Sequence, residues 1–152
     1  MIRLNRLTDY AIVVLSQMGR DGALRTAPQL AHETGVPLPT VAKLLKTLAT
    51  DGIIVSHRGA TGGYTLSRPP GAITVTQIVS SLEGPIALTA CVEGSGDHCG
   101  VEPLCPMRGN WEKVNGAIRG ALDKLTLADM AMTAVPAAFG APVSAPAAPS
   151  AR

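Results

Sequence analysis

All three cysteines of the chain lie in a single stretch, CVEGSGDHCGVEPLCPMRGNW, which is broken by glycine and proline. Cys91, Cys99 and Cys105 are separated by seven and then by five residues. In a reducing compartment, an odd number of cysteines favours metal, cofactor or redox chemistry over structural disulfides. A catalytic thiol needs a neighbouring base, and although His98 adjoins Cys99, the sequence offers no third group to orient that base. The stretch therefore predicts a binding or sensing loop.

Three kinds of sulfur chemistry suit this loop, and its spacing alone leaves them open. Structural zinc sites usually have closely spaced cysteine pairs and a complete tetrahedral set of ligands. Here the cysteines are more widely spaced, and the last ligand would have to be His98 or a carboxylate. An iron–sulfur cluster needs thiolates, tolerates wide spacing and accepts a ligand other than cysteine. We expect an iron–sulfur cluster, with zinc and a thiol redox switch as the alternatives.

Composition sets the class of protein. The chain has 152 residues, of which 46% are hydrophobic and only 3% aromatic, so its core must consist of Leu, Ile, Val, Ala and Met. A chain of this length can bury such a core without disulfides. No apolar run approaches the roughly 18 residues of a membrane span, and the run from Ala11 to Leu15 is too short for a secretory signal. We expect a cytoplasmic protein with no membrane partner.

Charge is distributed unevenly along the chain. Residues 1–68 contain eight Lys or Arg and four Asp or Glu, which gives a net charge of +4. Residues 69–152 contain five and seven, which gives −2. A basic half joined to an acidic half indicates an anionic partner for the first half.

The first half of the chain predicts a helix-turn-helix. Apolar residues recur at helical spacing in TDYAIVVLSQMGR, which Thr8 can cap, and in APQLAHETG, which Thr26 can cap and Gly35 can end. Two short helices joined by a tight turn, the second with an outward polar face, are what this motif requires. The second is VPLPTVAKLLKTLATDG, where Thr and Lys lie opposite a stripe of Val41, Leu44, Leu45 and Leu48.

A β-hairpin is predicted directly after these helices. IIVSHR and YTLSR have strand composition and flank the glycine-rich turn GATGG. A helix-turn-helix followed by a basic hairpin is a winged helix, in which Arg58 and Arg68 are placed to contact phosphate or a narrow minor groove. We expect His32 and His57 to be surface or DNA-facing residues rather than ligands.

The second half predicts further helices. ITVTQIVSSLEG has Thr74 and Gln77 at capping-box spacing, and Thr126 can cap a short helix over LADMAM. Between them lies a long amphipathic helix, with Trp111 expected as its core anchor. Because its stripe would face water in a monomer, we expect it to pair with a second subunit. A two-fold homodimer also suits near-palindromic DNA. The stripe consists of Trp111, Val114, Ile118, Leu122 and Leu125.

Together these elements predict a mainly α fold, with a winged helix-turn-helix DNA-binding domain and a long C-terminal dimerisation helix. We expect residues 1–83 to form the DNA-binding domain and residues 84–108 the cysteine-bearing loop. Residues 109–134 would form the dimerisation helix and a short closing helix. Residues 135–152 are rich in Ala and Pro and are expected to be disordered, because they cannot bury enough apolar surface.

The order of several motifs resembles the Rrf-type winged-helix transcription regulators of the IscR and NsrR types. The motifs are LNRLTDYAIVVL, the segment from VPLPTVAKLL to RGATGGYTLSR, and EGPIALTACVEG followed by CPMRGNW. The resemblance covers residues 1 to about 133, and is strongest to the subgroup that regulates the SUF system of iron–sulfur cluster assembly. It implies DNA binding and a cluster, with a 2Fe–2S cluster favoured over a 4Fe–4S cluster.

The resemblance also implies roles for individual residues. Cys91, Cys99 and Cys105 would ligate the cluster, and Arg58 would enter the minor groove. Base contacts would come from the start of the third helix, at Pro39, Thr40 and Lys43, and Lys46 and Thr47 lie on the same DNA-facing side.

The fourth ligand departs from the IscR pattern. That pattern has a histidine three residues after the last cysteine, where this chain has Arg108, and a guanidinium is not a normal ligand. Asp9 lies at the position from which the partner subunit supplies a carboxylate in the NsrR type. Glu93 and His98 are local alternatives.

The sequence therefore predicts a homodimeric, DNA-binding repressor that senses iron–sulfur cluster status and controls cluster assembly genes. One alternative is a winged-helix repressor with structural zinc or a thiol switch. Another is an interaction or cluster-handing module that does not bind DNA. An enzyme is not expected, since the sequence has no catalytic constellation.

Overall fold

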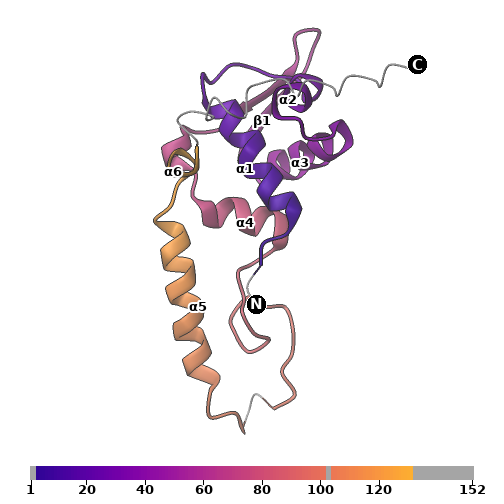
Figure 1. Cartoon of the computed structure of the whole chain (residues 1–152). Coiled ribbons are helices and arrows are strands. Elements are labelled where there is room, and N and C mark those ends of the chain that lie inside the picture. Colours follow the sequence, from indigo (N-terminus) through magenta and orange to yellow (C-terminus); the bar gives the residue numbers. More distant parts are fainter. Residues whose placement is uncertain (1–2, 102–103, 132–152) are drawn as a thin grey trace, which may run out of the picture.

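The computed structural model describes residues 3–101 and 104–131 (Figure 1). It confirms a mainly α fold with a small two-stranded antiparallel sheet. The segment expected to be disordered, residues 135–152, lies outside the described residues, as does the end of the predicted closing segment. No helix in the described ranges is long and apolar enough to cross a membrane. In chain order the elements are α1 (Arg6–Gly19), α2 (Ala27–Thr34), α3 (Leu38–Thr50), β1 (Ile54–His57), β2 (Gly63–Leu66), the 3₁₀ helix η1 (Pro70–Ala72), α4 (Val75–Glu83), α5 (Arg108–Asp123) and α6 (Leu127–Met130).

The core is aliphatic, as composition predicts. α1 and α3 contribute most of it, and α2, β1, α4 and α6 add single side chains around them. None of the described α5 side chains belongs to this core. The stripe predicted for α3 is confirmed, because Val41, Leu44, Leu45 and Leu48 are all fully buried.

The helix-turn-helix forms because good cap residues stand at the ends of its first helix. The Thr26 side chain accepts a hydrogen bond from the Gln29 N–H, and the Gln29 side chain accepts one from the Thr26 N–H at 2.8 Å. This capping box starts α2. Gly35 ends α2 with a φ of 72°, in the left-handed region that glycine adopts without strain. α3 follows almost at once, so the turn between the two helices is tight.

The predicted N-cap of α1 is wrong. Asn5 caps the helix, and its side-chain oxygen accepts a hydrogen bond from the Thr8 N–H at 2.9 Å. Thr8 lies inside the first turn and is fully buried. Both residue types are good caps, but the Thr8 hydroxyl makes a tertiary contact with Glu83 of α4, at 2.5 Å, and is not used for capping.

The wing is a hairpin with an additional short pairing. β1 and β2 are antiparallel, in a register that pairs Ile54 with Leu66 and His57 with Gly63. The backbone of Arg25, between α1 and α2, pairs with Tyr64 through hydrogen bonds of 3.1 and 2.8 Å. Gly63 is required here, because a Cβ would lie 2.8 Å from the Arg25 carbonyl oxygen. The hairpin is thereby joined to the segment that leads into α2.

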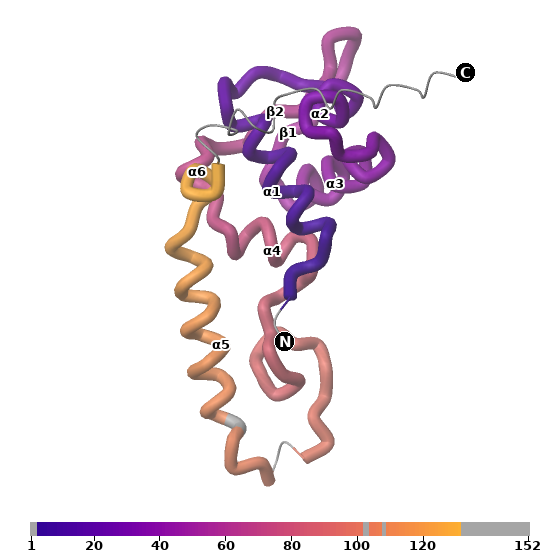
Figure 2. Tube along the Cα trace, in the orientation of Figure 1, coloured from indigo at the N-terminus to yellow at the C-terminus, as the bar shows by residue number. Residues whose placement is uncertain are grey.

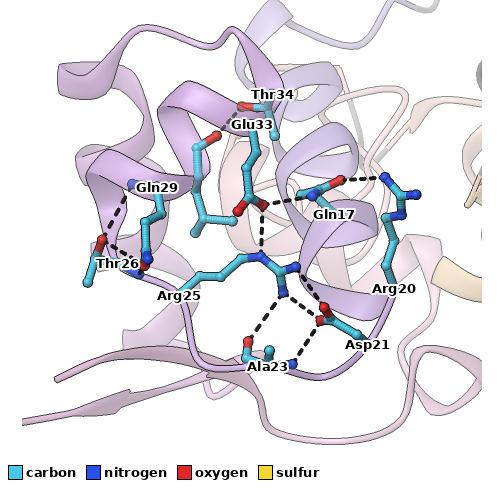
Figure 3. A network of polar contacts seen from close by, with 10 residues as sticks. Gln17, Arg20, Asp21, Ala23, Arg25, Thr26, Gln29, Glu33 and Thr34 are labelled. Atoms are coloured by element: carbon cyan, nitrogen blue, oxygen red, sulfur yellow. Dashed lines mark hydrogen bonds and ion pairs between the residues drawn. The ribbon is translucent and has the colours of Figure 1, made fainter. Parts of the chain in front are cut away.

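The side chain of Arg25 holds this region together (Figure 3). Its guanidinium donates to both Asp21 carboxylate oxygens, at 2.7 and 3.0 Å, and to Glu33 of α2 at 2.8 Å. Gln17 of α1 donates to the same Glu33 oxygen at 2.7 Å. The hydrogen bond from Arg25 is the main cause that lowers the pKa of Asp21 to about 2, and the hydrogen bond from Gln17 is the main cause that lowers the pKa of Glu33. The network fixes α2 relative to α1.

α5 stands beside the winged-helix domain and not within it (Figure 1 and Figure 2). It contacts α4, and its C-terminal end is joined to the start of α4 by a short antiparallel pairing of Thr74 with Thr126. Trp111, near the opposite end of α5, is 39% exposed. The expectation that Trp111 anchors the core is therefore wrong for a single chain, because α5 extends past the core at that end.

Candidate DNA-binding face and cysteine loop

The outward face of α3 holds the side chains that the sequence predicts to contact DNA. Lys43 and Lys46 are exposed, and no described carboxylate lies within ion-pair distance of either. Thr47 is half-buried, and its hydroxyl donates to the Lys43 carbonyl at 3.3 Å. Pro39 is exposed and Thr40 half-buried in the first turn of the helix. This face offers two uncompensated cations to an anionic partner.

The two arginines of the wing lie at opposite ends of the hairpin. Arg58 is exposed directly after β1, beside the turn. Arg68 follows β2 at the base of the hairpin, and its guanidinium lies 3.5 Å from the Gln77 side-chain oxygen of α4. Both arginines are exposed, and their contacts with DNA stay a prediction. His32 and His57 are exposed, and a ring nitrogen of His57 lies 2.8 Å from the Thr65 hydroxyl across the strands.

The cysteine loop consists of residues 84–107 and connects α4 to α5 (Figure 1). All three cysteines are free thiols, and each is half-buried. The Cys91 sulfur lies 3.2 Å from the Thr89 hydroxyl. The next residue, Val92, is only 3% exposed, so the backbone beside Cys91 is held by apolar burial.

Two side chains of α5 attach the loop to the helix. The Asn115 amide donates to the Ile86 carbonyl at 2.9 Å and accepts from the Leu88 N–H at 3.2 Å. The Glu112 carboxylate accepts a hydrogen bond from the Glu93 N–H at 3.1 Å. Asn115 is fully buried, although the other described side chains of α5 are exposed or half-buried.

The start of the loop is also joined to α1. Glu83, the last residue of α4, accepts a hydrogen bond from the buried Thr8 hydroxyl at 2.5 Å and one from the Asn5 N–H at 3.0 Å. These contacts place the start of the loop against the first turn of α1, which also carries Asp9. The loop is thus connected to α1 through Glu83 and to α5 through Asn115.

The described structure does not bring the three thiols into one ligand set. Over residues 3–101 and 104–131, no three His, Cys, Asp or Glu side chains are grouped closely enough to hold a metal ion. The donor types nevertheless fit an iron–sulfur cluster, because three reduced thiols lie on one loop and thiolates are its usual ligands. The assignment of Cys91, Cys99 and Cys105 as ligands stays a prediction.

The candidates for a fourth ligand lie in two separate pockets. Cys91, Glu93 and His98 line a pocket of about 700 Å³ between the loop and α5. Asp9 is exposed and lines a different pocket, of about 800 Å³, with Arg6 and other residues at the start of α1. Within one chain, Glu93 and His98 therefore share a pocket with a cysteine, and Asp9 does not.

Sequence reasoning missed Asn115, Glu112 and the junction of Thr8 with Glu83. One signal could have revealed Asn115: it lies four residues after Trp111 and three before Ile118, on the apolar face of the long helix. A polar residue at such a position needs a buried hydrogen-bond partner. No comparable signal exists for Thr8, whose partner is 75 residues away.

Comparison with known proteins agrees with this geometry. The family model for Rrf2, an iron-dependent transcriptional regulator, matches residues 4–133. The chain belongs to the Rrf2 family. An HTH-type transcriptional regulator of Mycobacterium tuberculosis is 30% identical over 89% of this chain and 84% of its own length. An rrf2-like HTH-type regulator of Rhodobacter capsulatus is 32% identical over 85% of this chain and 92% of its own length.

Solved structures of Rrf2-type regulators have the same architecture. CymR of B. subtilis, the global cysteine regulator, has a TM-score of 0.62 and 28% identity, over 86% of this chain and 97% of its own. IscR of T. potens has a TM-score of 0.62 and 26% identity, over 91% of this chain and 96% of its own. Rrf2 regulators bind DNA, and the winged helix-turn-helix is confirmed as the fold of this chain.

Proposed function

We propose that this Rrf2-family regulator is a homodimeric repressor whose cysteine loop binds an iron–sulfur cluster, and that the state of the loop sets its affinity for operators of iron–sulfur cluster assembly genes. The observation that carries the proposal is the placement of three free thiols on one loop, between α4 of the DNA-binding domain and α5. The iron-dependent description of the family and the likeness to IscR support it.

The proposal that the protein binds DNA depends on α3 and on the wing, which is the β1–β2 hairpin. The exposed Lys43, Lys46 and Arg58 supply charges for phosphate contacts, which account for much of the affinity and for its salt dependence. Pro39 and Thr40 lie in the first turn of α3, the part of a recognition helix that contacts base edges. Each base contact would add about 1–3 kcal/mol of discrimination.

The proposed dimer depends on the exposed apolar surface of α5. Trp111 is 39% exposed and Val114 44% on the helix, and Leu125, which follows the end of α5, is 43% exposed. A stripe of this kind marks an interaction surface. Pairing of two copies along α5 would cover this stripe. It would also present two winged helix-turn-helix domains to the two half-sites of a near-palindromic operator.

The proposal that the loop binds a cluster depends on its three thiols. Cys91, Cys99 and Cys105 would hold the cluster, and Asp9 of a second subunit is the proposed fourth ligand. When bound, a cluster supplies iron–thiolate bonds and a redox-active centre. Gathering the thiols requires the loop to change shape, and the loop is attached to α1 through Glu83 and to α5 through Asn115. Coupling of about 1–3 kcal/mol between loop and DNA would change affinity about 5- to 150-fold.

The deciding experiment is anaerobic purification of the full chain, followed by iron, zinc and acid-labile sulfide analysis and visible absorption. A coloured protein with iron and sulfide, from which iron is lost when the three cysteines are replaced by serine, supports the proposal. DNase footprinting of its own upstream region, with the loaded and the emptied protein, then tests the coupling. A colourless protein, or equal affinity of the two forms, would overturn it.

A second candidate is a thiol switch without a metal. It is favoured by the separation of the thiols among the described residues and by the likeness to CymR, a cysteine regulator. Diamide treatment of metal-free protein should then change DNA affinity, and the cysteine-to-serine variant should not respond. A colourless protein with one bound zinc per chain indicates the structural alternative, and absence of salt-sensitive, sequence-selective DNA binding indicates an interaction module.

The fourth ligand is tested by Asp9→Ala. Asp123→Ala is the matched control, because Asp123 is also an exposed helical aspartate but lies on α5. Loss of iron, or a changed visible spectrum, in the Asp9 variant alone supports ligation by Asp9. Unchanged iron content and spectrum would exclude it and leave Glu93 and His98.

A further inference from the structure

The cysteine loop has two parts that differ in how they are attached. The anchored limb, residues 84–96, carries Cys91, and the distal limb, residues 97–106, carries Cys99 and Cys105. In the anchored limb Val92 is buried, and the Ser95 hydroxyl donates to the Ala90 carbonyl at 2.8 Å, which closes a turn around Cys91.

The described residues of the distal limb, 97–101 and 104–106, are attached differently: the Asp97 N–H donates to the Ser95 hydroxyl at 3.3 Å. Leu104 is 92% exposed and Val101 67%, although both are large and apolar. Among the described residues of this limb, no hydrogen bond reaches α4 or α5; the Leu104 N–H bonds only to the Val101 carbonyl, at 3.1 Å. Among the described residues of the two limbs, hydrogen bonds to α5 therefore come from the anchored limb alone.

Asn115 of α5 makes two of the hydrogen bonds that attach the anchored limb to the helix. Both halves of its amide are used, one as donor to Ile86 and one as acceptor from Leu88, and the side chain is fully buried. A buried amide with both groups satisfied by backbone fixes that backbone in one position, because leaving either group without a partner is costly. Glu112, one turn earlier on α5, adds the bond to the Glu93 N–H.

We infer that Asn115 is a positioning residue: by fixing the backbone of Ile86 and Leu88 it holds the Cys91 thiol in place against α5. The role of that thiol as a cluster ligand rests on the proposed function. The pocket beside Cys91 is lined also by His98 and by Glu112 of α5.

The test measures the reactivity of each thiol in the reduced, metal-free full chain. Pulsed alkylation with N-ethylmaleimide, followed by peptide mass spectrometry, gives a separate rate for each cysteine. In the wild-type chain Cys91 should react most slowly. Asn115→Ala should accelerate Cys91 by about fivefold or more, the effect of losing a typical hydrogen bond, and leave Cys99 and Cys105 unchanged.

Three further variants make the result specific. Asn110→Ala is the matched control, because Asn110 is an exposed asparagine on the same helix, and it should leave all three rates unchanged. Glu112→Ala should accelerate Cys91 in the same direction, and Glu112→Gln, which keeps an acceptor oxygen, should restore the wild-type rate. Both Glu112 variants keep the buried Asn115, so they test the attachment even if Asn115→Ala alters helix content.

The inference is overturned if the wild-type thiols react at equal rates, if Asn115→Ala leaves Cys91 unchanged, or if it accelerates all three thiols equally. A purely structural role would produce that last pattern, seen together with a lower melting temperature. Because no cluster and no DNA are present, the result is independent of the proposed function. Absence of iron from anaerobic protein would refute the cofactor and leave the Asn115 result standing.

Discussion

Replacing Lys43 and Lys46 together by alanine tests whether α3 contacts DNA. Both side chains are exposed, and no described carboxylate compensates their charge. They are three residues apart on one helix, so they share a face. The opposite face carries the buried Leu44, Leu45 and Leu48, which the double variant keeps. The variant should therefore fold normally and lose only surface charge.

The expected effect is a change in salt dependence. The slope of log K against log salt falls by about 0.9 for each phosphate contact that is lost. If both lysines of both subunits in the proposed dimer contact phosphate, the slope should decrease by about 3.6. If only one lysine in each subunit does so, the decrease should be about 1.8.

The assay is fluorescence anisotropy with a labelled duplex from the chain's own upstream region, between about 50 and about 200 mM salt. Lys113→Ala combined with Lys124→Ala is the matched control, because both are exposed lysines at the opposite side of the fold, in and beside α5. A slope that is unaltered in the Lys43/Lys46 variant, or reduced equally in the control, would refute the assignment of α3 as the DNA-contacting helix.

Three further predictions concern stability. Leu45→Ala should lower the free energy of unfolding by about 2–5 kcal/mol, measured by urea denaturation, because it opens a cavity in the fully buried core. The pKa of Asp21 is about 2 in the folded chain against an ordinary 3.8, so its charge stabilises the fold above about pH 4, and this contribution is lost as the pH falls through about 2. Asp21→Asn should therefore reduce the loss of melting temperature on acidification, and an identical acid profile would contradict the role of the Arg25 network. Thr8→Val should lower stability by about 1 kcal/mol in urea, through loss of the bond to Glu83; no change would show that water replaces the hydroxyl without cost.

The elements that the sequence predicted correctly are those encoded locally. Thr26 and Gln29 are three residues apart and form the predicted capping box, and Gly35 ends α2 as expected. The apolar stripe of α3 is buried because helical periodicity alone places its members on one side. The same holds for Thr74, which caps α4 with Gln77.

The features that were missed depend on contacts distant in sequence. Asn5 and Thr8 are both good caps, and only the position of Glu83 on α4 decides that Thr8 is buried and bonded elsewhere. Trp111 belongs to an apolar stripe. The periodicity of that stripe does not specify whether it packs against the same chain or against another one. The attachment of the loop before Cys91 depends on Asn115, which is more than 20 residues from its partners Ile86 and Leu88.

The attachments of the loop define a path of contacts from the loop to α3, the helix proposed to contact DNA. Glu83 is both the last residue of α4 and the acceptor for Thr8 and Asn5 of α1, so a displacement at the start of the loop acts directly on the first turn of α1. α1 in turn contacts α2 and α3, and the Arg25 network fixes α2 to α1. The coupling that a regulator needs, about 1–3 kcal/mol, equals the contribution of one or two hydrogen bonds. In the proposed function, making or breaking the Glu83 contacts would therefore supply a free energy of the size that the coupling needs.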